Sequence, residues 1–151
     1  MAGSMIFLIV SVVVLNVAAL MMSKRLTAWE IWTTSLFALV CELVVNIVLD
    51  LKFDLYGYFE KGVQGGSFIA IFGLYPSANT IFLNFYPFGR PKWQKVLYIL
   101  GWSGFCFIFE YASLKLGYFY YHGWKLWYSA LCYPPLLWLM VLNLQLIRRL
   151  R

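Results

Sequence analysis

Long apolar stretches separated by short polar segments are the dominant pattern along this chain. Five of these stretches are long enough to cross a bilayer, because roughly 20 apolar residues span a hydrocarbon core of about 30 Å. They occupy residues 5–22, 29–49, 67–86, 93–116 and 128–150. The pattern predicts an all-α membrane protein with five transmembrane helices, which form a single domain over residues 5–151.

Local signals mark several boundaries of these helices. Residues 1–4 precede a second methionine, Met5, and we interpret them as the remnant of an added expression leader. The spacing Thr27-x-x-Glu30 is that of a capping box, which predicts the start of the second helix. Pro76 lies inside the third stretch and Pro134 in the first third of the fifth, where a proline begins or kinks a helix.

The composition supports a location in the membrane. Hydrophobic residues make up 63% of the chain and charged residues only 12%, against about 25% charged residues in soluble domains. A soluble fold of 151 residues cannot hide so many large apolar side chains from water, whereas a bilayer accepts them on the protein surface. The composition therefore excludes an ordinary soluble domain.

Lysines and arginines are concentrated in the connections on one side of the predicted bundle. That side carries eight of the 12, which are Lys24, Arg25, Arg90, Lys92, Lys95, Arg148, Arg149 and Arg151. The positive-inside rule predicts that this side is cytoplasmic, so that the N-terminus lies outside and the C-terminus in the cytoplasm. The net charge of +6 follows from this bias and suits membrane lipids with anionic headgroups, so we expect no nucleic-acid partner.

Aromatic side chains gather on the opposite side in two segments. One segment contains Tyr56, Tyr58 and Phe59, and the other runs from Tyr118 to Tyr128. We interpret them as an interfacial aromatic belt, since tryptophan and tyrosine favour the level of the headgroups. The alternative is an aromatic lid over a pocket that opens outward.

Two glutamates, Glu42 and Glu110, lie inside stretches that are otherwise apolar. A carboxylate in hydrocarbon is costly, so an ionisable residue within a membrane span indicates a functional site. Small and polar residues accompany each glutamate at helical spacing, so each glutamate lies on a helix face of small and polar side chains. We expect these two helix faces to point into the bundle. The two stripes are Ser35, Ala38, Glu42, Asn46 and Asp50, and Ser103, Cys106, Glu110, Ser113 and Gly117. The alternative role for each glutamate is a neutral acid that fixes helix packing through hydrogen bonds.

Parts of the chain resemble each other, which indicates an internal repeat. The matching segments are Ser35-x-x-Ala38-x-x-x-Glu42 with Ser103-x-x-Cys106-x-x-x-Glu110, and Tyr75-Pro76 with Tyr133-Pro134. Both copies run from inside to outside and back, so we expect a parallel repeat of helix pairs two–three and four–five. Such a repeat predicts that Glu42 and Glu110 face each other across a pseudo-twofold axis.

These residues predict a polar pocket between helices two to five that is centred on the two glutamates. The predicted ligand-binding residues are Glu42, Asn46, Asp50, Tyr75, Asn79 and Glu110. The leading hypothesis is that a small ligand, lipid or cation binds in this pocket or passes through it. Because five helices are few for a complete transporter, this hypothesis favours a homodimer.

Two other functions remain open. The first is a membrane-embedded enzyme that acts on a lipid or isoprenoid and uses Glu42 or Glu110 as a general acid. The second is a non-catalytic subunit whose acidic stripes pair with another membrane protein.

The sequence identifies no cofactor and gives only weak signals for a metal. Asp50 and Asp54 lie at the outer interface and have oxygen ligands that suit Mg²⁺ or Ca²⁺, but a solvated helix end beside Lys52 is the simpler interpretation. His122, the single histidine, has no partner at the spacing of a metal site or a catalytic triad. The three cysteines lack metal-ligand spacing and are expected to be small buried hydrophobes: Cys41, Cys106 and Cys132.

Three runs carry a resemblance to a known family. They are residues 42–58, the motif Gly73-Leu74-Tyr75-Pro76 together with residues 82–88, and residues 117–128. Over about residues 25–148 the chain resembles a family of uncharacterised small multi-pass integral membrane proteins from Gram-positive, spore-forming bacteria. This resemblance implies a bacterial cytoplasmic membrane and carries no activity. In architecture the chain is also similar to membrane-integral carotenoid and terpene cyclases, which are parallel-repeat bundles with intramembrane carboxylates, although their acidic signatures are not reproduced.

Overall fold

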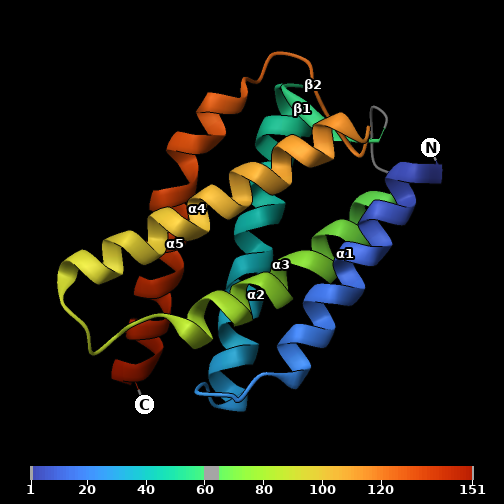
Figure 1. The fold of residues 1–151 in the computed structure, drawn as a ribbon. Coiled ribbons are helices and arrows are strands. Elements are labelled where there is room, and N and C mark those ends of the chain that lie inside the picture. The colour runs from blue at the N-terminus through green and yellow to red at the C-terminus, as the bar shows by residue number, and fades with distance from the viewer. Residues whose placement is uncertain (1, 60–64, 151) are drawn as a thin grey trace.

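The computed structural model describes residues 2–59 and 65–150 and consists mainly of helices (Figure 1). The elements are α1 (Ala2–Met21), α2 (Ala28–Val45), η1 (Asn46–Lys52), β1 (Tyr56–Tyr58), α3 (Gly65–Phe85), α4 (Lys92–Lys115), β2 (Phe119–Tyr121) and α5 (Leu126–Leu150). With η1 counted as the end of α2, five helices in the described residues are long and apolar enough to cross a membrane. The predicted number of long helices is confirmed.

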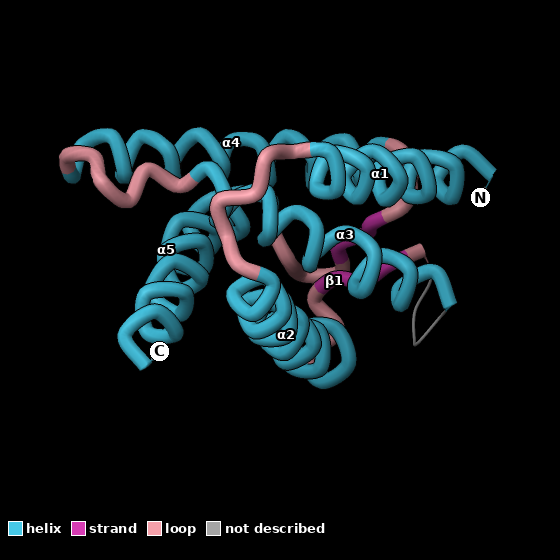
Figure 2. Tube along the Cα trace, turned by 90° about the horizontal axis from the view of Figure 1, so that it is seen from below, coloured by secondary structure: helices cyan, strands magenta, loops and turns pink. Residues whose placement is uncertain are grey.

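The helices are arranged as a ring. α3 packs between α1 and α2, while α5 packs between α2 and α4. The ring closes where Phe7 of α1 stacks on Phe109 of α4, with ring centroids 5.3 Å apart. Seen from below in Figure 2, the order α4, α5, α2, α3, α1 can be followed around the bundle.

The outward faces of the helices are apolar. Leu20 on α1 is 73% exposed, Ile108 on α4 is 67% exposed, and Leu131 on α5 is 66% exposed. In water such a surface would be a large aggregation-prone patch, whereas in lipid it has no cost. The distribution of apolar side chains therefore fits a multi-pass membrane protein.

A close approach of α1 and α3 depends on a glycine and an asparagine. A Cβ atom at Gly73 would lie 2.9 Å from the methyl groups of Val12, so only glycine allows this helix spacing. Asn16 joins the two helices by donating from Nδ2 to the carbonyl of Gly73 (2.8 Å), and its Oδ1 accepts a hydrogen bond from Ser77 (2.7 Å). Small residues and side-chain amides are the usual means of packing helices in lipid.

The predicted capping box at the start of α2 is confirmed. Thr27 Oγ1 accepts from the backbone N–H of Glu30 (3.3 Å), and Glu30 Oε2 accepts from the backbone N–H of Thr27 (2.8 Å). The other carboxylate oxygen of Glu30 accepts from Nε of Arg148 at 2.6 Å. This ion pair joins the beginning of α2 to the end of α5.

The second span does not stay α-helical to its end. From Asn46 to Lys52 it widens into the π-helix η1, and the backbone N–H of Phe53 bonds to the carbonyl of Val48, five residues earlier. A π-helix has more residues per turn than an α-helix. The stripe predicted at α-helical spacing from Ser35 to Asp50 is therefore interrupted after Asn46.

The two aromatic segments form a short antiparallel ladder, β1 with β2. Its register pairs Tyr56 with Tyr121, Gly57 with Tyr120, and Tyr58 with Phe119. The all-α prediction holds for the spans but did not include this sheet. Alternating aromatic residues favour extended backbone, and the pairing joins segments that lie about sixty positions apart in the sequence.

Candidate functional site

A cavity of about 320 Å³ lies inside the ring of helices and beneath the ladder. Most of its wall is apolar or aromatic and comes from all five helices; examples are Leu15, Ala38, Leu74, Phe105 and Leu136. Glu42 and Glu110 both line it, one from α2 and the other from α4. A mostly apolar cavity with a few convergent polar groups is the usual form of a small-molecule site.

The Glu42 carboxyl is held by donors from three directions. Asn46 Nδ2 donates to Oε1 at 2.7 Å, and the hydroxyl of Tyr58 in β1 donates to the same oxygen at 3.0 Å. The hydroxyl of Tyr75 on α3 also bonds to this carboxyl and lies 2.9 Å from the hydroxyl of Tyr58. The two tyrosines thus form a connected hydroxyl pair beside Glu42.

The Glu110 carboxyl accepts three hydrogen bonds from hydroxyl groups. Tyr121 of β2 and Ser129 of α5 donate to Oε1, the latter at 2.8 Å, and Tyr133 of α5 donates to Oε2. Ser129 in turn accepts from the indole N–H of Trp124 at 2.8 Å. The side chain of Glu110 is buried, so these donors replace the water that a carboxyl requires.

The surroundings of the two glutamates correspond. Each carboxyl accepts from a tyrosine of the ladder, which is Tyr58 for Glu42 and Tyr121 for Glu110. Each also bonds to a tyrosine that directly precedes a proline on the following helix, Tyr75 or Tyr133. The ladder is centred on the pair Gly57 and Tyr120, and Tyr58 and Tyr121 each follow one member of this pair by one residue. These two tyrosines therefore occupy equivalent positions in the ladder.

Tyr58 and Tyr121, the ladder tyrosines that contact the glutamates, are suited to donate hydrogen bonds. Burial raises the pKa of Tyr58 well above its ordinary value. Burial, together with the bond to Glu110, also raises the pKa of Tyr121. Both hydroxyls therefore keep their protons through the neutral and mildly alkaline range, and both can donate to the carboxyls.

Asn79 is a buried polar side chain without a partner among the described residues. It lies one turn beyond Tyr75 on α3, lines the cavity and is 7% exposed. Neither its Nδ2 nor its Oδ1 has a hydrogen bond. Because an orphaned amide costs free energy in an apolar interior, it indicates that the cavity receives a polar group from elsewhere.

The structure brings together most, but not all, of the residues predicted for the pocket. Glu42, Tyr75, Asn79 and Glu110 line the cavity, and Asn46 supports it by holding Glu42. Asp50 is not among the lining residues. Leu49, which follows Glu42 by seven residues or about two helical turns, lines the wall instead.

Asp54, one of the two weak candidates for a metal ligand, is paired with another side chain. Asp54 Oδ2 lies 3.1 Å from Nδ1 of His122, so the aspartate forms a pair with the single histidine. Within residues 2–59 and 65–150 no three histidine, cysteine, aspartate or glutamate side chains are close enough to hold a metal ion. The three cysteines are unpaired and line the cavity: Cys41, Cys106 and Cys132.

Sequence reasoning missed five groups that contact the glutamates or their partners: Tyr58, Tyr121, Trp124, Ser129 and Tyr133. In the sequence, Tyr58, Tyr121 and Trp124 fit an interfacial aromatic belt, because nothing local distinguishes a membrane-anchoring ring from a hydrogen-bond donor. The repeated Tyr-Pro dipeptide was the usable signal, since it marks both Tyr75 and Tyr133. No protein-family model, curated protein or solved structure matches the chain.

Proposed function

We propose that this protein binds a small amphiphilic, lipid-like molecule inside the bundle, with its polar end at Glu42 and Glu110. The observation that carries the proposal is a single, mainly apolar cavity into which carboxyls from two different helices project. Its volume of about 320 Å³ lies at the lower end of the usual range for ligand pockets, about 300–1,000 Å³.

The lining favours a ligand with an apolar body and a hydrogen-bond donor or positive charge at one end. Aliphatic and aromatic side chains make up most of the wall. They provide few hydrogen-bonding groups and therefore suit the apolar body of a ligand. The carboxyls are acceptors, while the unpartnered Asn79 amide offers both a donor and an acceptor. A hydroxyl, amine or amide head group satisfies both features.

The same geometry supports the proposal that α2–α3 and α4–α5 form a parallel repeat. Each half supplies a glutamate, a ladder strand after it, and a tyrosine before a proline. The antiparallel register of the ladder is that expected of two strands related by a twofold axis through Gly57 and Tyr120. Ligand sites at the interface of such repeats are common in membrane proteins.

A second candidate function is proton transfer to a bound isoprenoid or lipid. The hydroxyl of Tyr58 contacts both Glu42 (3.0 Å) and Tyr75 (2.9 Å), which forms a path along which a proton can move. A glutamic acid connected to such a path meets the geometric requirement for a general acid. This candidate differs from simple binding in predicting a chemically altered product.

We also propose a bacterial cytoplasmic membrane as the location, with the N-terminus outside. The support is the concentration of lysine and arginine at the end where α1, α3 and α5 finish. The ladder and the glutamates then lie toward the outer side.

The test is mass spectrometry of molecules that copurify with the protein in mild detergent. The wild type is compared with Glu42→Gln/Glu110→Gln and with Asp50→Asn as a control, since Asp50 does not line the cavity. The expected result is a discrete small molecule that the double variant loses and the control retains. An altered form of the same molecule in wild-type membranes favours the enzyme.

A second variant separates the cavity from the carboxyls. Ala38 is buried and lines the cavity, so Ala38→Trp fills it while both glutamates stay. Loss of the same molecule in this variant supports an occupant of the cavity. Bulk lipid alone, unchanged in all variants, contradicts the proposal.

A further inference from the structure

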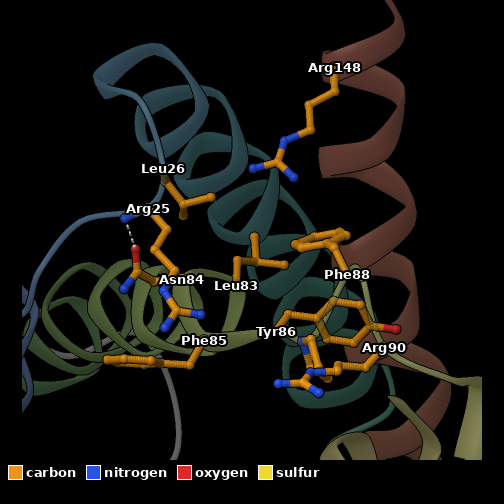
Figure 3. A pocket seen from close by; sticks show the side chains of 11 residues that line it. Arg25, Leu26, Leu83, Asn84, Phe85, Tyr86, Phe88, Arg90 and Arg148 are labelled. Carbon is orange, nitrogen blue, oxygen red and sulfur yellow. Dashed lines mark hydrogen bonds between the residues drawn. The ribbon is translucent and has the colours of Figure 1, made fainter. Parts of the chain in front are cut away.

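A second cavity, of about 390 Å³, lies at the end of the bundle opposite to the ladder (Figure 3). Its wall comes from the α1–α2 connection, the end of α3, the α3–α4 connection and the last turns of α5. It shares two wall elements, α3 and α5, with the glutamate cavity, but neither glutamate lines it.

Three arginines from separate segments meet at this second cavity: Arg25, Arg90 and Arg148. In the part of the chain that the structure describes, Arg148 is the only one of the three with a carboxylate partner, Glu30. The cavity therefore retains an excess of positive charge. Apart from Asn84, its other walls are apolar or aromatic, and none of the described residues that line it is acidic.

The backbone that carries Arg25 is fixed by a buried asparagine. Asn84 Oδ1 accepts from the backbone N–H of Arg25 at 2.7 Å, and Asn84 Nδ2 donates to the carbonyl of Ser23 at 3.0 Å. Asn84 is only 2% exposed. A buried amide thus holds the connection in place, so the position of Arg25 at the cavity does not depend on a loose loop.

Aromatic rings support two of the guanidinium groups. The guanidinium carbon of Arg148 lies 4.6 Å from the ring centroid of Phe88, and that of Arg25 lies 5.8 Å from the centroid of Phe85. Stacking on a ring leaves the N–H edge of a guanidinium available for an acceptor. Figure 3 shows Arg148 reaching in from α5, on the side of the cavity away from Arg25 and Arg90.

We propose that this basic cavity binds a phosphate group. Guanidinium groups match phosphate oxygens in charge and in fork geometry, and arginine is the preferred residue for such recognition. The cavity lies at the same end as Lys24, Lys92 and Lys95, the level that lipid headgroups occupy in a membrane. Leu26, Leu83 and Phe85 provide apolar wall for the part of the molecule attached to the phosphate.

The phosphate has two sources, a phospholipid headgroup and a free phosphorylated solute. Thermal unfolding of the purified protein in uncharged detergent distinguishes them. The protein is titrated with dioleoylphosphatidylglycerol, with dioleoylglycerol as a phosphate-free match, and with inorganic phosphate. Saturable stabilisation by the phospholipid alone identifies a headgroup, and saturable stabilisation by inorganic phosphate identifies a soluble source.

Charge-matched variants test the site itself. The variant Arg25→Gln/Arg90→Gln removes two positive charges that line the cavity. The control Lys92→Gln/Arg149→Gln removes two positive charges at the same end of the bundle that do not line the cavity. The first pair is expected to raise the half-saturating concentration of the stabilising probe about tenfold. The second pair is expected to change it less than about twofold.

Two outcomes overturn the proposal. One is equal weakening by both double variants, which reduces the effect to general attraction toward a basic surface. The other is the absence of saturable stabilisation of the wild type by any phosphate probe. Gel filtration verifies folding, and if the first double variant aggregates, the single substitutions Arg25→Gln and Arg90→Gln supply the same comparison. This test is independent of the copurification experiment with the Glu42→Gln/Glu110→Gln variant, because neither glutamate lines the basic cavity.

Discussion

The side chain of Tyr120 occupies the space in which a side chain at Gly57 would lie. A Cβ atom at Gly57 would be 2.5 Å from the hydroxyl oxygen of Tyr120 and 2.7 Å from its Cζ. The two residues are directly opposed in the ladder. Their neighbours in the ladder, Tyr58 and Tyr121, carry the hydroxyls that hold the glutamates. The fit of a ring over a glycine therefore positions the donors of the site.

Gly57→Val is expected to destabilise the protein by about 1–3 kcal/mol, because valine at this position overlaps the Tyr120 ring and forces the strands apart. Thermal unfolding in detergent measures the change. Gly101→Ala is the control, since nothing lies within 4 Å of a Cβ atom there. Gly57→Val/Tyr120→Ala should recover part of the loss; no recovery would show that the ring is not the cause.

Arg148→Ala is expected to lower the free energy of unfolding by about 1 kcal/mol, more than Arg149→Ala does. The Glu30 carboxyl is buried and retains its capping bonds in this variant, but it loses its only ion pair within the described residues. The estimate is modest because the Arg148 side chain is 38% exposed and solvent screens the pair. Equal effects of the two substitutions, measured by thermal unfolding, would contradict this role.

Asn79→Leu is expected to stabilise the ligand-free protein by about 1–3 kcal/mol, because it removes two buried polar atoms that have no partner. The same substitution should weaken retention of the copurifying molecule. Unfolding after delipidation measures the first effect and mass spectrometry the second. A destabilised ligand-free variant would mean that the amide is satisfied within the protein. Asn84→Leu is the contrast, since Asn84 has two hydrogen bonds and its loss should destabilise.

Stability is expected to fall as the pH rises above about 10. Tyr58 and Tyr121 have a raised pKa in the folded protein, whereas in the unfolded chain they ionise near 10. Below that value both states are protonated and stability is constant; above it the unfolded state loses protons first, so the folded state becomes relatively less stable. Unfolding measured between pH 8 and 11.5 tests this. In Tyr58→Phe/Tyr121→Phe the decline should be shallower, and an unchanged slope would contradict it.

The sequence predicted the features that depend on nearby residues. The lengths of the apolar stretches predict the five helices, and Thr27 and Glu30 predict the capping box because its bonds join residues three apart. The depth of Glu42 and Glu110 within their stretches is enough to select them, since the other charged residues of these stretches lie near the ends.

The features that the sequence did not predict depend on distant or subtle geometry. The ladder requires residues 56–58 to meet residues 119–121, and aromatic side chains alone do not specify a partner. No sequence pattern announced the π-helical turn at η1, and Asp50 in this turn is not among the residues that line the cavity. The sequence predicts Asn79 as a ligand-binding residue, but only the packed bundle reveals that its amide has no hydrogen-bond partner among the described residues.

The contributions of α5 have a consequence for the order in which the protein is completed. Ser129 and Tyr133 of this helix satisfy Glu110, and Arg148 satisfies Glu30. α5 follows both glutamates in the chain, so these three partners are synthesised after the carboxyls that they satisfy. A nascent chain interrupted before α5 carries these acidic groups exposed to lipid or to the insertion machinery. A chain that stops before α5 is therefore expected to be less stable in the membrane than one that includes it, because these acidic side chains lack their hydrogen-bond partners.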